Sequence, residues 1–130
     1  MKRRVVITGL GVVTSLSCQV NDLFQRLLNG ESGIHALKIF DTSKFKVKLG
    51  GDIWDWELPE AYLDRKEAKR LDRFSQFAIV GAIDAIRDAG LDFNKEDANR
   101  CGVILGSGIG GLTEIEEQVT KLVEKGPDRV

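Results

Sequence analysis

A glycine-rich turn is the first candidate for chemistry in this sequence of 130 residues. Gly106-Ser-Gly-Ile-Gly-Gly111 follows an apolar run and precedes a helical pattern, which is the context of a dinucleotide-binding fingerprint. The helix after it begins with Glu114, Glu116 and Glu117, whose carboxylates would repel a pyrophosphate. We therefore interpret the turn as a tight strand-to-helix connection beside an apolar part of a ligand, and nucleotide binding is the alternative.

A second candidate is a nucleophile with a base, formed by Cys18 and His35. No activating base lies near Cys18 in the sequence, and His35 falls in a segment without a clear element. We favour a non-catalytic role for Cys18 and a loop position for His35, and we expect Cys101 to lie in the core. Two cysteines and one histidine predict neither a disulfide framework nor a zinc site.

Basic side chains on one helical face indicate a third kind of site. Four of them fall within an arc of about 100° on a helix: Lys66, Lys69, Arg70 and Arg73. Such a face could dock an acidic partner, because its positive potential speeds association. The same spacing is typical of a solvated helix end whose basic residues pair with acids three or four positions away. The residues alone leave both interpretations open.

Strand and helix patterns alternate along the chain and must position these groups. Runs 5–8 and 101–105 are apolar at successive positions, which is typical of strands buried on both faces of a parallel sheet. A weaker strand is predicted around 46–53. Helices are predicted from Asn21 to Gly30, from Pro59 to Asp88, and from Thr113 to about Gly126. This order favours an α/β layered fold with a largely parallel sheet.

The long predicted helix has an unusual second half. Residues 77–83 are apolar on every side, which predicts a helix that is covered all round. Its small residues would allow another element to approach closely: Ala78, Gly81, Ala82 and Ala85. Three strands make a narrow sheet for this much apolar surface, so we expect the chain to be part of a larger fold.

Composition excludes several classes of protein. A net charge of −1 gives no overall attraction to nucleic acid or to an anionic membrane. Hydrophobic residues make up 42% of the chain, which excludes a disordered protein. No apolar run approaches the roughly 18 residues of a membrane span. We therefore expect a soluble, cytoplasmic protein.

Five strings of the sequence carry a resemblance to a known family. They are Arg3–Thr14, Leu27–Ile34, Phe40–Ser43, Leu71–Ala78 and Gly106–Gly111. In this order and spacing they resemble the N-terminal part of the type II β-ketoacyl-acyl-carrier-protein synthases, which are thiolase-like condensing enzymes. The resemblance covers nearly the whole chain. It departs from the family pattern after the first strand, at Ser15, Ser17 and Cys18.

The resemblance implies both a fold and a reaction. Residues 1–130 would form the incomplete N-terminal half of a thiolase-like α/β/α/β/α layered fold. The whole protein, a homodimer, would condense acyl-acyl carrier protein with malonyl-acyl carrier protein in fatty-acid elongation, by a decarboxylative Claisen condensation without a metal or organic cofactor. The family's nucleophilic cysteine, two histidines and lysine correspond to positions beyond Val130. No catalytic residue is therefore assigned, and residues 1–130 alone are expected to be inactive.

The resemblance also implies roles for particular residues. Ile109 would be the gate of the acyl pocket, with Gly108 and Gly110 allowing the loop to move. The residues expected to dock the acidic acyl carrier protein are Lys66, Lys69, Arg70 and Arg129. A non-catalytic subunit that resembles the chain-length factors of polyketide synthases is the alternative function, and a nucleotide-binding module is a further one.

Overall fold

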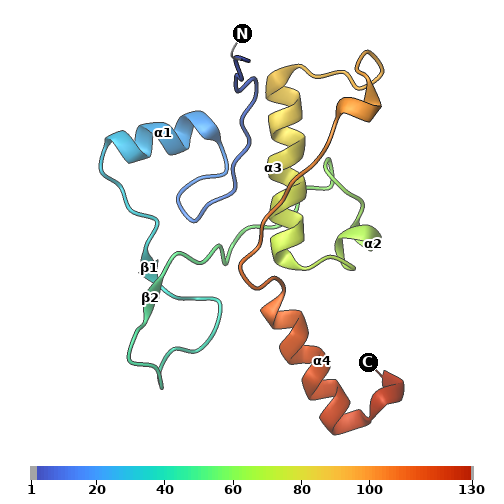
Figure 1. Cartoon of the computed structure of the whole chain (residues 1–130). Coiled ribbons are helices and arrows are strands. Elements are labelled where there is room, and N and C mark those ends of the chain that lie inside the picture. The colour runs from blue at the N-terminus through green and yellow to red at the C-terminus, as the bar shows by residue number, and fades with distance from the viewer. Residues whose placement is uncertain (1–2, 130) are drawn as a thin grey trace.

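The computed structural model describes residues 3–129 and is organised around one long helix, α3 (Arg73–Ala89). In Figure 1 the other elements lie around α3 or extend below it. In chain order they are α1 (Val20–Leu28), β1 (His35–Ala36), β2 (Leu49–Gly50), α2 (Arg65–Ala68), the 3-10 helix η1 (Ala98–Arg100), α4 (Leu112–Lys125) and the 3-10 helix η2 (Pro127–Arg129).

The helix ends follow local sequence signals in most places. Gly90 ends α3 in the left-handed conformation, with φ 61°, as its position after the apolar run predicts. α1 is also confirmed, but Gln19 and not Asn21 occupies its N-cap, with no side-chain cap bond. α4 begins at Leu112 after Gly111, one residue before the predicted cap at Thr113. Both predicted N-caps, Asn21 and Thr113, therefore lie two residues after the observed ones, Gln19 and Gly111.

The predicted continuous helix from Pro59 to Asp88 is wrong. It is divided into α2 and α3 by a turn at residues 69–72, where Asp72 has an extended backbone with ψ 153°. The Asp64 carboxylate accepts the backbone N–H groups of Lys66 and Glu67, so it starts α2 as a separate short helix. The Gln76 side-chain amide donates to the Ala68 and Leu71 carbonyls and fastens the end of α2 to α3.

The predicted parallel sheet does not form among residues 3–129. There the only paired strands are β1 and β2, which are antiparallel with His35 opposite Gly50. The predicted strand over 46–53 is thus confirmed in part. Runs 5–8 and 101–105 are extended but unpaired, and Ile104 is 98% exposed. Since a strand needs a neighbour to bond its backbone groups, an apolar pattern alone could not form this sheet.

The N-terminal extended segment lies directly against α3. A Cβ atom at Gly9 or Gly11 would overlap the carbonyl oxygens of Ala85 and Gly81. The Leu10 N–H donates to the Asp88 carboxylate over 2.9 Å, which holds the segment to the helix. The small residues on α3 therefore permit the close approach that the sequence predicted.

Little of the chain is buried. Val80, on α3, is the one buried residue of the part described, at 4% exposure. The accessible surface is 11131 Å², whereas a compact monomer of this size exposes about 6,800 Å². The apolar half of α3 is therefore only partly covered, and Cys101 is exposed rather than in the core. Residues 3–129 expose apolar surface that further protein surface would have to cover.

Candidate functional site

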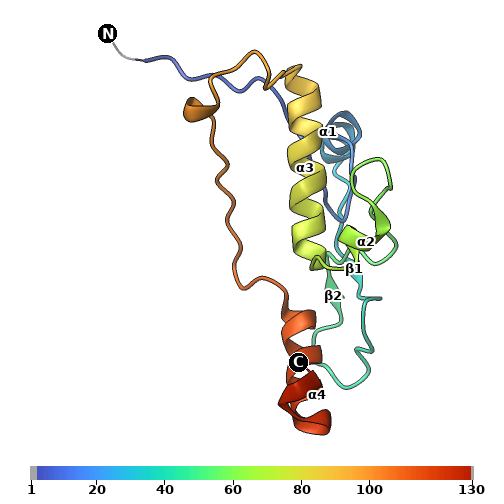
Figure 2. The same cartoon turned by 90° about the vertical axis from the view of Figure 1, so that its right-hand side faces the viewer.

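The glycine turn joins an extended segment to α4. Figure 2 shows this segment running alongside α3 from η1 down to α4. At its end, Gly110 has φ 93°, a backbone conformation that side-chain-bearing residues rarely adopt, and Ile109 is 73% exposed at the bend. A Cβ atom at Gly108 would meet no atom within 4 Å. The side of the turn that carries Ile109 is thus unobstructed.

An apolar cavity begins at the start of this turn. It has a volume of about 390 Å³ and lies between α3 and the extended segment. Its wall on α3 includes Phe74, Phe77 and Ile79, and Leu105 and Gly106 line the other side. Such a lining suits an aliphatic chain better than a phosphate, because it offers few polar groups. Ile109 is close to this cavity in sequence but does not line it.

A second group of residues gives α2 and the turn after it a basic surface. Lys66, Lys69 and Arg70 are exposed, and none of them forms an ion pair within residues 3–129. The carboxylate of Asp64 is turned towards the backbone at the start of α2, and Arg65 pairs with Glu60 over 2.5 Å. We call Lys66, Lys69 and Arg70 the α2 basic surface.

Two predicted members of the basic set lie elsewhere. Arg73 is turned inward: its guanidinium donates to the Ile53 carbonyl over 2.5 Å and lies 5.3 Å from the ring centres of Trp56 and Phe77. The predicted stripe of four cations therefore ends at Arg70. Arg129 is exposed in η2, which lies beyond the end of α4 and below α2 in both views (Figures 1 and 2).

The sequence did not predict the pairing of His35 with Asp52. His35 belongs to β1 rather than to a loop, with Nδ1 3.1 Å from the Gly33 carbonyl and Nε2 2.5 Å from the Asp52 carboxylate. The other Asp52 oxygen accepts the backbone N–H groups of Lys38 and Ile39, over 2.8 and 2.9 Å. No spacing signal marks two residues that only the pairing of β1 with β2 brings together.

The Asp52 carboxyl titrates at lower pH than usual. Burial raises its pKa, but the N–H groups of Lys38 and Ile39 and the nearby His35 ring outweigh that effect and lower the pKa below its ordinary value. Its side chain is only 6% exposed. Asp52 therefore remains ionised and holds the β1–β2 segment together.

Cys18 and His35 do not form a catalytic pair. Both line a cavity of about 470 Å³, but within residues 3–129 no hydrogen bond joins them. The two ring nitrogens of His35 face Gly33 and Asp52, so neither is free to accept the thiol proton. The same residues contain no group of three or more side chains arranged to hold a metal ion.

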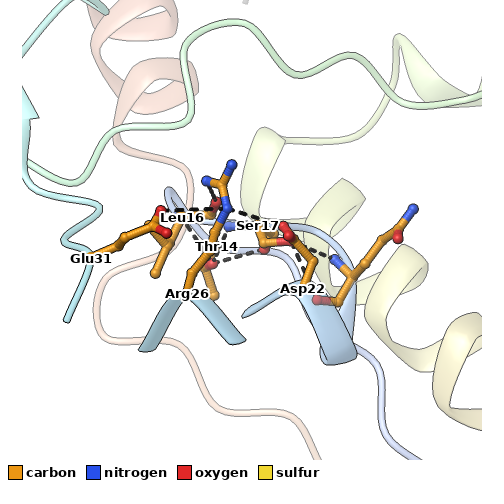
Figure 3. Close-up of polar contacts among 7 residues, drawn as sticks. Thr14, Leu16, Ser17, Asp22, Arg26 and Glu31 are labelled. Carbon is orange, nitrogen blue, oxygen red and sulfur yellow. Dashed lines mark hydrogen bonds and ion pairs between the residues drawn. The ribbon is translucent and has the colours of Figure 1, made fainter. Parts of the chain in front are cut away.

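Arg26 organises the turn before α1, which is where the sequence departs from the family pattern. Its guanidinium contacts three acceptors: the Leu16 carbonyl at 2.6 Å, Asp22 at 3.2 Å and Glu31 at 3.7 Å. The Thr14 hydroxyl donates to the Ser17 carbonyl over 2.8 Å and accepts the backbone N–H of Ser17. Figure 3 shows these hydrogen bonds and ion pairs. These bonds stabilise the turn that leads into α1.

Comparison with known proteins gives a family match over almost all of the chain. The family described as "Beta-ketoacyl synthase, N-terminal domain" matches residues 2–129. The chain is 44% identical over 128 residues to 3-oxoacyl-[acyl-carrier-protein] synthase 2 of Synechocystis, and 42% identical to the protein of the same name from Staphylococcus aureus. These alignments cover 98% of the chain but only 30% and 31% of the relatives, so the chain spans less than a third of their length.

Solved structures give the same result for the fold. The ishigamide ketosynthase/chain length factor superposes on 97% of the chain with a TM-score of 0.83 and 27% identity, over 31% of its own chain. A second structure is a type II polyketide synthase acyl-carrier protein in complex with its ketosynthase bound to the hexaketide. It superposes with a TM-score of 0.67 at 24% identity, over 96% of this chain and 32% of its own, which is a likeness of fold alone.

No helix within residues 3–129 combines the length and the apolar character needed to cross a membrane.

Proposed function

This chain belongs to the β-ketoacyl synthase family, and from that premise we propose that the whole protein condenses acyl-acyl carrier protein with malonyl-acyl carrier protein in fatty-acid elongation. The fold expected from the resemblance is confirmed, because the chain has the thiolase-like fold of a ketosynthase N-terminal region. The observation that carries the proposal is the 44% identity over 98% of the chain to 3-oxoacyl-[acyl-carrier-protein] synthase 2.

The proposed reaction proceeds in two stages. A cysteine thiolate attacks the acyl thioester and the thiol of the carrier protein leaves, so the acyl group becomes bound to the enzyme. Malonyl-carrier protein then loses CO2, and the resulting carbanion attacks the enzyme thioester, which releases 3-oxoacyl-carrier protein and restores the thiolate. Backbone amides stabilise the oxyanion. The nucleophile would come from positions beyond residue 130, so residues 1–130 alone would not catalyse condensation.

Within this scheme we assign the glycine turn to the acyl chain. Ile109 would gate the acyl pocket, with Gly108 and Gly110 giving the turn its freedom. The support is the exposed Ile109 side chain, the open space at Gly108 and the apolar cavity that starts at Gly106. A larger side chain at residue 109 tests the assignment, because it would obstruct long acyl groups before short ones.

We assign the α2 basic surface to docking of the acyl carrier protein. An acidic partner would find cations there that have no ion-pair partner within residues 3–129. Arg129 is proposed as a separate contact, since η2 is not part of α2. Charge reversal of the α2 basic surface, measured against reversal of other exposed lysines, tests this assignment. We further propose a homodimer that acts in the cytoplasm.

The superposition on a ketosynthase/chain length factor is also compatible with one alternative, a non-catalytic subunit of a polyketide synthase, but supports it no better than the proposed condensing enzyme. Condensation assayed with the whole protein separates the two, because a chain-length factor without the nucleophile forms no product alone. The nucleotide-binding alternative is weaker. The Asp72 carboxylate lies against Gly111 at the start of α4, where a phosphate would have to bind.

A further inference from the structure

We propose that Asp72 is a positioning residue that fixes one end of the glycine turn, so that residues 106–109 move about Gly110 and Gly111. The inference rests on the proposed function of Ile109 as a gate. It deepens that function, because it assigns the hinge of the gate and the side chain that holds the hinge.

The first observation is a close contact between α3 and the turn. A Cβ atom at Gly111 would lie 2.5 Å from each carboxylate oxygen of Asp72. That distance is much shorter than any van der Waals contact, so the carboxylate occupies the space that a side chain at residue 111 would need. Gly111 is therefore required because of Asp72, and not because of its own backbone conformation, which has φ −79°.

The second observation explains why the Asp72 side chain is free to contact the turn. Asp72 stands at the N-cap of α3, where an aspartate ordinarily bonds the first turn of its own helix, yet it forms no such bond. α4 begins after a glycine that has no side chain to cap it. Because the Asp72 carboxylate lies against Gly111, the N-cap of α4, it lies at the positive end of that helix, where negative charge is stabilising.

The third observation is a second contact beside the first, between Phe74 and Gly110. A Cβ atom at Gly110 would lie 3.7 Å from the Phe74 ring. The N-cap residue Asp72 therefore lies against Gly111, and Phe74 of α3 lies against Gly110. A Cβ atom at Gly106 or at Gly108 would meet no atom within 4 Å. The turn is therefore packed at its α4 end and open at its other end, and Ile109 precedes the packed end directly.

The test compares four variants of the whole protein by hydrogen exchange of the Leu112 and Ile115 backbone amides, which donate to the Gly110 and Gly111 carbonyls. Asp72→Ala removes the contact, and Asp72→Asn keeps its shape without the charge. Gly111→Ala places a methyl group into the carboxylate, whereas Gly102→Ala is the matched control that adds a methyl group to open space outside the turn. We expect Asp72→Asn to raise exchange about two- to fivefold, the range that corresponds to loss of one charge at a helix end. Asp72→Ala and Gly111→Ala should raise it more, and Gly102→Ala should not alter it.

A second readout tests the link to the gate. The rate of enzyme acylation is measured for a long and a short acyl thioester, and we expect Asp72→Ala to change the ratio of the two kcat/KM values while Asp72→Asn restores part of it. A merely structural loss would lower both rates together. An amide exchange rate in Asp72→Ala equal to that of the wild-type protein would contradict the role of Asp72 in fixing the hinge. Raised exchange with an unchanged acylation ratio would overturn the link to the gate. Absence of acylation by the wild-type protein would instead contradict the proposed function and leave the exchange result to decide the hinge.

Discussion

Reversal of two charges on the α2 basic surface should weaken binding of the acyl carrier protein. Lys66→Glu and Lys69→Glu replace two exposed ammonium groups that have no ion-pair partner within residues 3–129. An exposed ion pair contributes about 0.2–1 kcal/mol, and reversal exchanges each attraction for a repulsion of similar size. The pair of substitutions should therefore cost about 1–4 kcal/mol, and a central value of about 2 kcal/mol corresponds to a roughly 30-fold higher Kd.

The assay is titration of the whole protein with acyl carrier protein at low and high salt. Lys46→Glu combined with Lys48→Glu is the matched control, since it changes the net charge equally on an exposed segment away from α2. The Kd of the α2 variant should rise well above that of the control at low salt, and the difference should shrink as the Debye length falls from about 10 Å to about 3 Å between 0.1 and 1 M salt. Equal Kd values for the two double variants at low salt would refute docking on this surface.

Three further predictions test other parts of the account. Ile109→Phe should lower kcat/KM for long acyl thioesters more than for short ones, and an unchanged ratio of the two would remove its role as a gate. Gly11→Ala should destabilise the whole protein by about 1–3 kcal/mol in urea unfolding, because the added methyl group would overlap the Gly81 carbonyl, whereas Gly102→Ala adds it to open space and should have little effect. Because the pKa of Asp52 is lowered in the folded state, its stabilising effect is present above the unfolded pKa of about 4 and is lost as the pH falls through the folded pKa. Asp52→Asn should therefore lower the Tm at pH 6 and lose this effect at low pH, and a Tm difference that does not depend on pH would contradict the role of the charge.

Features that depend on neighbouring residues in the sequence could be predicted. The left-handed Gly90 ends α3 as the pattern indicated, and the small residues of α3 do accept the N-terminal segment. The break between α2 and α3 was missed because the segment contains no proline or glycine there. It depends on Asp64 capping the first helix and on Gln76 bonding the carbonyls at the end of that helix.

Features that depend on residues distant in the sequence could not be predicted. The apolar runs 5–8 and 101–105 have the composition of buried strands, but pairing requires neighbours that residues 3–129 do not provide. His35 meets Asp52 only when β1 pairs with β2. The candidate gate was found through the resemblance and not from the periodicity of the sequence, and its contact with Asp72 could be seen only in the structure.

Formation of 3-oxoacyl-carrier protein is the measurement that tests the central proposal most directly. The whole protein is incubated with acyl-carrier protein and malonyl-carrier protein, and the carrier-bound products are identified by mass spectrometry. The expected product is two carbons longer than the acyl group, and one CO2 is released for each condensation. A purified, folded whole protein that binds the acyl-carrier protein but yields no elongated product would contradict the account and favour the non-catalytic subunit.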